Sequence, residues 1–216
     1  MAIEHLESIT DSVRDEFELV QAARDLALRR SRELVRICAK AIRAMHRGEW
    51  DSAESQLQTA RNAAETLIKG VENYPNLYYA GYTQDSLKEF VEASLVSALM
   101  QDQPFPTPAE LKVEGNTYLN GMAEAATEMR RRILDMNRHG YSTDAEKLLG
   151  KMDEIYSYLV TFDFTDSITG GLRRRTDTVR GVLERTRGDL TTTYRQTQLE
   201  SALKALESKL GSSSAE

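Results

Sequence analysis

Hydrophobic residues recur every three or four positions over residues 4–47, and no glycine or proline interrupts them before Gly48. This spacing is typical of one face of an α-helix. It predicts a first helix of roughly 40 residues, which is unusually long for a globular protein. Such a helix needs an apolar partner along its whole length, from the same chain or from another one. The residues that form the pattern are Leu6, Ile9, Val13, Phe17, Val20, Leu34, Ile37, Ala41 and Met45.

The same period continues to the end of the chain, and no segment shows the alternation of a β-strand. The pattern predicts an all-α, single-domain bundle of about seven helices over residues 1–210, followed by a disordered tail over 211–216. Caps and breaks set the helix ends. After the first helix, we expect one helix from an N-cap at Asp51 to Val71 and another from Pro75 to Gln101, in which Gly81 is a kink or the true start. Further helices are expected over 108–138, from 142 or 143 to 162, and over 171–187. After a break at Gly188-Asp189, a last helix is expected to reach Leu210.

Composition narrows the class of protein. The chain has 216 residues, 40% of them hydrophobic, with a net charge of −6 and a single cysteine, Cys38. The mild acidity argues against a general cationic nucleic-acid binder, although it allows a local basic surface. One cysteine excludes an internal disulfide and suits a reducing compartment. The sequence has neither a signal-peptide pattern nor an apolar run long enough to span a membrane, so we expect a cytoplasmic protein.

Two pairs of glutamates are the main candidates for chemistry. Glu89 and Glu92 lie three positions apart in one predicted helix, and Glu124 and Glu128 lie four apart in another. Residues at these spacings share a helix face. If the two faces met, four carboxylates would offer the oxygen ligands that Mg²⁺ and Mn²⁺ prefer, and a metal held there could promote phosphodiester hydrolysis.

The spacing alone favours a simpler interpretation, in which all four glutamates are solvated surface charges. Other metal sites are weaker candidates still. None of the three histidines follows a glutamate by three positions, as a di-iron bundle requires, and one cysteine with three scattered histidines does not suit structural zinc. No glycine-rich phosphate loop occurs. Cys38, between Ile37 and Ala39, is expected to be a buried, inert thiol.

Basic residues recur along the later part of the first helix at spacings of seven, four, three and four. They form a stripe of Arg29, Arg36, Lys40, Arg43 and Arg47, and a second cluster comprises Arg173–Arg175 and Arg180. Such a stripe can bind the phosphates of a nucleic acid. A solvated stripe balanced by Glu33, Glu49 and Asp51 explains the pattern equally well. Tyrosines between Tyr74 and Tyr82 could stack on single-stranded bases, or simply pack between helices.

Several stretches together resemble the translin family, and most closely its translin-associated factor X branch. "LKEFVEA" (87–93) is similar to that branch's Q-E-[FY]-V-E-A, and "YLNGMAEAATEMRR" (118–131) to its Y-L-x-G-V-A-D-x-x-x-E-L-x-R. "LRRRTDTVRGVLERTRGDL" (172–190) resembles the family's L-R-x-x-[FY]-D-x-[LV]-[KR] segment, and "ARDLALRRSR…AMHRG" its basic first helix. The order and spacing agree over roughly residues 20–190, which is most of the chain.

The resemblance implies an all-α protomer in a hollow homo-octamer that binds single-stranded RNA or DNA. The factor X branch is a metal-dependent endoribonuclease, whereas translin itself only binds nucleic acid. Glu89, Glu92 and Glu128 match the branch's glutamates, and Glu124 stands where the branch has aspartate. We therefore expect a Mg²⁺- or Mn²⁺-dependent endoribonuclease with these four residues as catalytic metal ligands, and translin-type binding without catalysis as the alternative.

Overall fold

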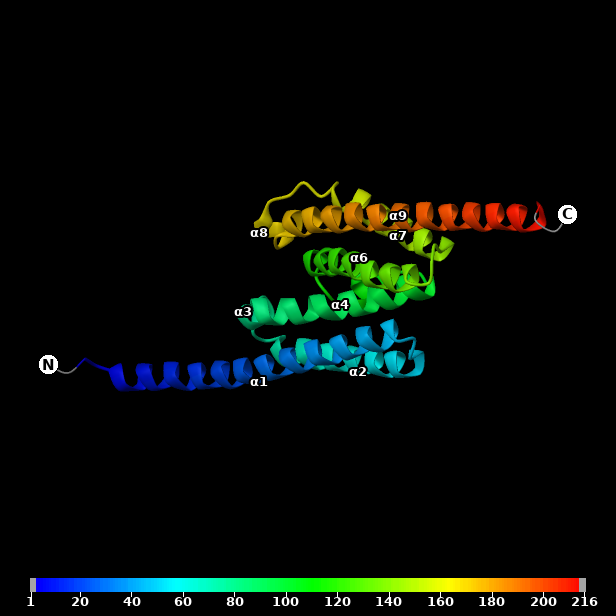
Figure 1. Ribbon diagram of the computed structural model, residues 1–216. Coiled ribbons are helices and arrows are strands. Elements are labelled where there is room, and N and C mark those ends of the chain that lie inside the picture. Colours follow the sequence, from blue (N-terminus) through cyan, green and yellow to red (C-terminus); the bar gives the residue numbers. More distant parts are fainter. Residues whose placement is uncertain (1–2, 214–216) are drawn as a thin grey trace. The chain divides into compact units, whose positions relative to one another are not determined.

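The computed structural model describes residues 3–213, and over this range the chain is helical without any strand (Figure 1). The predicted all-α, translin-like class with a very long first helix is confirmed. No helix in this range is long and apolar enough to cross a membrane. The helices are α1 (Leu6–His46), α2 (Trp50–Val71), α3 (Pro75–Tyr78), α4 (Gly81–Gln101), α5 (Pro108–Leu111), α6 (Gly115–Asn137), α7 (Thr143–Leu159), α8 (Asp166–Thr169) and α9 (Leu172–Ser213).

The chain divides into two compact units. The first comprises residues 3–100 and 104–121, and the second comprises residues 101–103 and 122 onward. The prediction of one domain over 1–210 stays a prediction. The predicted disordered tail, 211–216, falls in part on residues 214–216, which lie outside the described residues, whereas α9 extends to Ser213.

The first unit is built on the hairpin of α1 and α2, which run side by side in Figure 1. Gly48 makes the turn with a φ of 74°, a left-handed conformation that glycine adopts without strain. The core of this unit consists of side chains that are almost fully buried, namely Leu34, Met45, Leu67, Leu87, Phe90 and Leu95. The first half of α1 extends beyond α2 and stays largely exposed (Figure 1).

The second unit is built on α7 and α9, which pack together, with the later part of α6. Its largest fully buried side chains are Met129, Ile133, Met152, Leu159, Leu172 and Leu190. The predicted break at Gly188-Asp189 is wrong, because α9 continues through it. A helical glycine costs only about 1 kcal/mol, and the buried residues Leu183, Thr186 and Leu190 keep this stretch packed.

Two other predicted boundaries are wrong. Residue Asp51 does not cap α2; it lies in the first turn, and Glu49 occupies the N-cap position. The helix expected over 108–138 is two helices, because Lys112 adopts a left-handed conformation with a φ of 56° and ends α5. The start at residue 108 is as predicted, and Thr107 caps it: its hydroxyl accepts from the Glu110 amide, and the Glu110 carboxylate accepts from the Thr107 amide.

Candidate metal and nucleic-acid site

Glu89 and Glu92 lie on the one partly exposed strip of α4, whose other side chains are mostly buried. The three-residue spacing directs both carboxylates to the same side of the helix, as predicted. The buried Lys88 places its Nζ 3.2 Å from Glu89 Oε1 and so compensates part of the negative charge. A buried lysine next to this pair was not foreseen from the sequence, because nothing in its position separates it from a surface lysine.

The sole cysteine lies close to the same two carboxylates. Burial, reinforced by the charges of Glu89 and Glu92, raises the pKa of Cys38 to about 12. The thiol therefore stays protonated at neutral pH, and a protonated thiol is neither a nucleophile nor a metal ligand. Cys38 is a buried, inert thiol, as expected from its place in the helix.

A glycine brings α6 against α4 within the first unit. A Cβ at Gly121 would lie 2.7 Å from the Val91 Cβ and 2.8 Å from the Lys88 carbonyl oxygen, which is closer than real side chains approach. Only the missing side chain of glycine permits this distance between the helices. Glu124 follows Gly121 by three residues in the same continuous helix, α6. The contact at Gly121 therefore also fixes where the turn that carries Glu124 begins.

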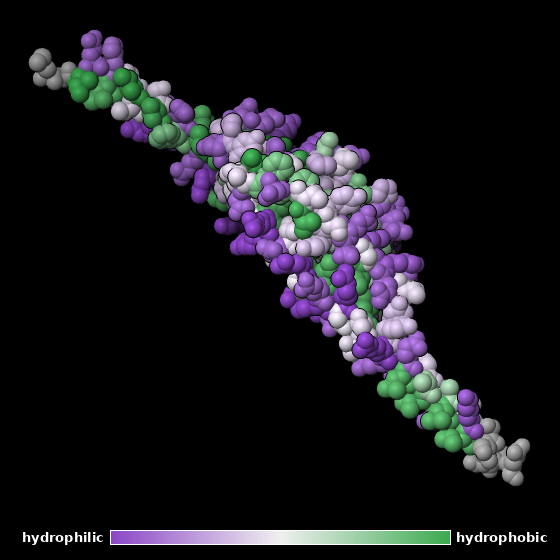
Figure 2. All heavy atoms as spheres, turned by 90° about the horizontal axis from the view of Figure 1, so that it is seen from above, coloured by the Kyte–Doolittle hydropathy of each residue, from purple (hydrophilic) through white to green (hydrophobic). Residues whose placement is uncertain are grey.

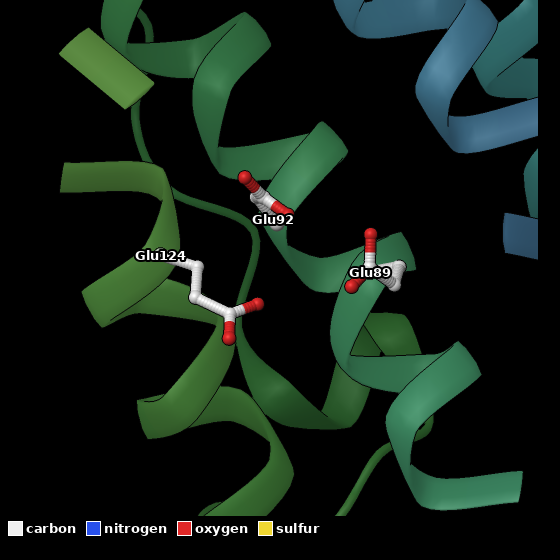
Figure 3. Close-up of side chains that lie close together, drawn as sticks. All are labelled: Glu89, Glu92 and Glu124. Carbon is white, nitrogen blue, oxygen red and sulfur yellow. The ribbon is translucent and has the colours of Figure 1, made fainter. Parts of the chain in front are cut away.

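The carboxylates of Glu89, Glu92 and Glu124 gather at this point (Figure 3). One oxygen from each lies within 4.8 Å of the others, and all three side chains are half-buried. The structure therefore brings three of the four glutamates together, and their role as metal ligands stays a prediction. The carboxylate of Glu128 is not part of this group and lies 4.0 Å from the Arg131 guanidinium, so its role as a ligand stays a prediction.

Arg175 of α9 holds Glu124 within the second unit. Its Nε donates a hydrogen bond of 3.0 Å to Glu124 Oε1, and its terminal nitrogen donates to the Gly170 carbonyl oxygen at 3.3 Å. The Arg173–Arg175 run was noted in the sequence as a basic cluster, but not as a partner of a candidate metal ligand. The run itself is the only sequence signal, because the pairing depends on how α6 and α9 pack.

All five members of the basic stripe on α1 are exposed. Arg36 pairs with Glu33 at 3.3 Å, and Arg47 pairs with Glu49 at 2.6 Å. These two positive charges are balanced by neighbouring acids, as the alternative of a solvated stripe proposes. Arg29, Lys40 and Arg43 make no ion pair within residues 3–213. These three cations therefore remain available to anions from solution.

Of the tyrosines before α4, Tyr78 packs against its neighbours and Tyr79 is exposed to solvent. Tyr78 donates a hydrogen bond to Glu114 at 3.2 Å and packs edge-to-face against Tyr79 at 4.9 Å. Burial and the Glu114 carboxylate raise the pKa of Tyr78 to about 12. Tyr79 is 65% exposed and is the member of this group with a ring open to solvent.

Comparisons with known proteins agree with this architecture. No family model matches the chain. An uncharacterised protein of Methanocaldococcus jannaschii is 29% identical over 199 residues, which cover 91% of this chain and 83% of that protein. The structure of AfC3PO in complex with duplex RNA has a TM-score of 0.79 and 32% identity, covering 85% of this chain and 95% of that one. A second structure, a crystal structure of AfC3PO, has a TM-score of 0.78 at 32% identity.

Apo-NeC3PO has the same fold, with a TM-score of 0.79, 22% identity and coverage of 89% of this chain. The likeness at 32% identity spans nearly the whole of AfC3PO, and the sequence resemblance had indicated the same group. The chain therefore belongs to the translin family of C3PO-type proteins.

Proposed function

We propose that this protein is an endoribonuclease of the factor X type that cuts single-stranded RNA with the help of Mg²⁺ or Mn²⁺. The observation that carries the proposal is the approach of three carboxylate oxygens, from Glu89, Glu92 and Glu124, to within 4.8 Å of one another. Three like charges at this separation repel one another, so the arrangement favours a bound cation.

The three carboxylates fit a small hard cation. Mg²⁺ binds oxygens at about 2.1 Å, so three oxygens within 4.8 Å of one another would each have to move by about an ångström to share an ion. A donor set of oxygens alone suits Mg²⁺ or Mn²⁺ rather than zinc, and the pKa of Cys38 keeps its sulfur out of the set.

Glu89, Glu92 and Glu124 would bind the ion, and Glu128 is the fourth candidate ligand. A bound ion supplies Lewis acidity toward the phosphodiester and favours ionisation of water. A carboxylate that is not fully engaged with the ion can accept the proton of the attacking water, and Arg175 keeps Glu124 oriented toward the site.

Binding of the substrate strand is supported by the basic stripe and by the relatives. Arg29, Lys40 and Arg43 present unpaired charge along α1, with Arg36 and Arg47 completing the stripe, and phosphates are the anions that such a stripe attracts. AfC3PO is described in complex with duplex RNA, which supports RNA as the ligand class of this chain. Single-stranded DNA is a further candidate, because phosphate contacts do not distinguish the two sugars.

A cleavage assay on labelled single-stranded RNA tests the proposal. Wild-type protein should cut in Mn²⁺ or Mg²⁺ and stop in EDTA, and Glu92→Gln should abolish cleavage while RNA binding stays intact. Glu54→Gln is the matched control, because Glu54 is an exposed glutamate of α2 whose loss removes the same charge. Parallel reactions with duplex RNA and single-stranded DNA define the substrate. Retained cleavage by purified Glu92→Gln would overturn the assignment.

The alternative is a translin-type binding protein without catalysis, and one contact favours it. Arg175 already satisfies an oxygen of Glu124, so this carboxylate has a partner without any metal. The alternative predicts that divalent ions change neither RNA affinity nor RNA integrity. Isothermal titration of the protein with Mn²⁺ separates the two, since a binding protein of this kind has no need of the ion.

We also propose that the protein associates with copies of itself. The exposed part of α1 carries an apolar stripe at helical spacing, formed by Leu6, Ile9, Val13 and Phe17, which are between 42% and 66% exposed. Figure 2 shows hydrophobic side chains gathered over this end of α1 and over the end of α9, where Leu199, Leu203, Leu206 and Leu210 are exposed. Stripes of this kind are buried in stable assemblies. We expect a homo-oligomer, and the family resemblance favours a homo-octamer.

A further inference from the structure

Lys88 of α4 is the only buried lysine among residues 3–213, with 9% of its surface exposed. A buried ammonium loses its hydration, so it needs a negative partner close by. Its Nζ lies 3.2 Å from Glu89 Oε1 and donates a hydrogen bond to it. Its backbone is held as well, because Gly121 of α6 lies against the Lys88 carbonyl oxygen. The position of this positive charge is therefore set by the fold.

The charge of Lys88 lies at the edge of the candidate metal ligands. Glu89 is its neighbour in the chain, and Glu92 follows it by four positions, on the same side of α4. Figure 3 shows Glu89 and Glu92 on α4 and Glu124 on α6, and one oxygen of each lies within 4.8 Å of the others. Lys88 thus already bonds to one of the carboxylates that the proposed ion would bind.

Lys88 has opposite effects on the empty and the filled site. While no ion is bound, its charge offsets the repulsion between neighbouring carboxylates and keeps Glu89 in one orientation. A divalent ion that enters the site is repelled by the ammonium, and it competes with Lys88 for the carboxylate of Glu89. The same lysine therefore stabilises the ligand set in advance and weakens the binding of the ion.

We propose that Lys88 is a built-in counter-ion of the carboxylate site, and that a divalent ion must displace it from Glu89 in order to bind. The inference rests on the proposed function, because it takes the three carboxylates to be metal ligands. Lys88 acts through Glu89 and is a positioning residue, with no part in the cleavage itself. Its presence predicts a preformed site of moderate affinity, from which the ion exchanges with solution.

The sequence resemblance suggests the substitution that tests this role. In the stretch "LKEFVEA", Lys88 stands where the similar motif of the factor X branch has glutamine. Lys88→Gln removes the charge but retains a polar side chain, so it tests the charge. Lys88→Met removes the same charge with an apolar side chain of similar length, which suits a buried position if the glutamine variant does not fold.

Isothermal titration with Mn²⁺ measures the competition directly. Removal of one positive charge a few ångströms from a divalent ion should tighten Mn²⁺ binding about tenfold in Lys88→Gln and Lys88→Met. Lys88→Arg retains the charge and should bind Mn²⁺ as the wild type does. Lys112→Gln is the matched control and should leave the affinity unchanged, because Lys112 also pairs with a glutamate, Glu65, at 3.0 Å, but on the exposed surface.

Thermal melts in EDTA measure the counter-ion role without any metal. Lys88→Gln should lower the melting temperature, because Glu89 loses its partner, and Lys88→Gln combined with Glu89→Gln should recover part of the loss. Unchanged or weaker Mn²⁺ binding in both neutral variants, or additive effects of the two substitutions on the melt, would overturn the role of Lys88 while leaving metal-dependent cleavage standing. A wild-type chain that binds no Mn²⁺ would overturn the proposed metal site and this inference together.

Discussion

Gly121 of α6 lies so close to Val91 of α4 that a Cβ at position 121 would stand 2.7 Å from the Cβ of the valine. The carbonyl oxygen of Lys88 bounds the same space at 2.8 Å, and a backbone atom cannot rotate away as a side chain can. The separation of the two helices that carry the candidate metal ligands is therefore fixed by the absence of a side chain.

Replacement of this glycine should damage both stability and the site. Gly121→Ala must push α6 away from α4, and overpacking of this kind costs about 1–3 kcal/mol. The shift would also move Glu124, so Mn²⁺ affinity should fall. Chemical denaturation and Mn²⁺ titration measure the two effects.

Gly115→Ala is the control for Gly121→Ala, since it lies on the same helix with nothing within 4 Å of the added Cβ. It should leave Mn²⁺ affinity unchanged and stabilise the fold by up to about 1 kcal/mol. Equal stability of Gly121→Ala and Gly115→Ala would show that the close contact between α6 and α4 does not require a glycine at position 121.

Binding of the ion should stabilise the folded chain through the three carboxylates. A ligand at a hundred times its dissociation constant adds about 2.7 kcal/mol to the free energy of unfolding. Glu89→Gln, Glu92→Gln and Glu124→Gln should each lose most of the increment that Mn²⁺ gives to the melting temperature. Glu128→Gln tests the fourth candidate: a retained increment would exclude Glu128 as a ligand, and its loss would add Glu128 to the set.

Alkaline pH should destabilise the protein through Cys38. The pKa of this thiol is ordinarily 9.0 and is about 12 in the folded chain, so the folded state holds the proton more tightly than the unfolded state does. The resulting stabilisation is complete below about pH 9 and is lost as the pH rises toward 12, at no more than about 1.4 kcal/mol per pH unit. Cys38→Ala should lower stability at neutral pH but flatten this decline.

Thermal melts of wild-type protein and Cys38→Ala between about pH 8 and pH 10.5 measure the difference. Tyr78→Phe provides a comparison, because the pKa of Tyr78 is also raised to about 12 and contributes separately in the same direction. Parallel pH curves for wild type and Cys38→Ala would show that the buried thiol does not contribute.

The apolar stripe of α1 should be required for assembly. Val13→Ser with Phe17→Ser removes two large exposed side chains, and burial of each in an interface is worth about 1.5–3 kcal/mol. Light scattering after size-exclusion chromatography should therefore show a smaller species. Asp11→Ser with Glu18→Ser changes polar residues of the same segment and should leave the mass unchanged. An unaltered mass in the Val13 and Phe17 variant would place the interface elsewhere.

Local patterns in the sequence determined much of the fold. The 3.6-residue period of α1, the glycine at the end of its hairpin and the cap at Thr107 all depend on neighbouring residues. The same locality explains the errors. Helical propensity favoured one helix through Lys112, but Lys112 is left-handed and ends α5. It also favoured a break at Gly188, but α9 continues because its buried flank outweighs a cost of about 1 kcal/mol.

The candidate site divides in the same way. Spacing within one helix was enough to pair Glu89 with Glu92, and the resemblance indicated Glu124 as their counterpart. The sequence could not distinguish Glu124 from Glu128, nor identify Arg175 as the partner of Glu124, because both depend on the depth at which one helix packs against another. The depth at which α6 packs against α4 is set by Gly121, which is visible in the sequence but whose effect depends on its contact with Val91 in the folded chain.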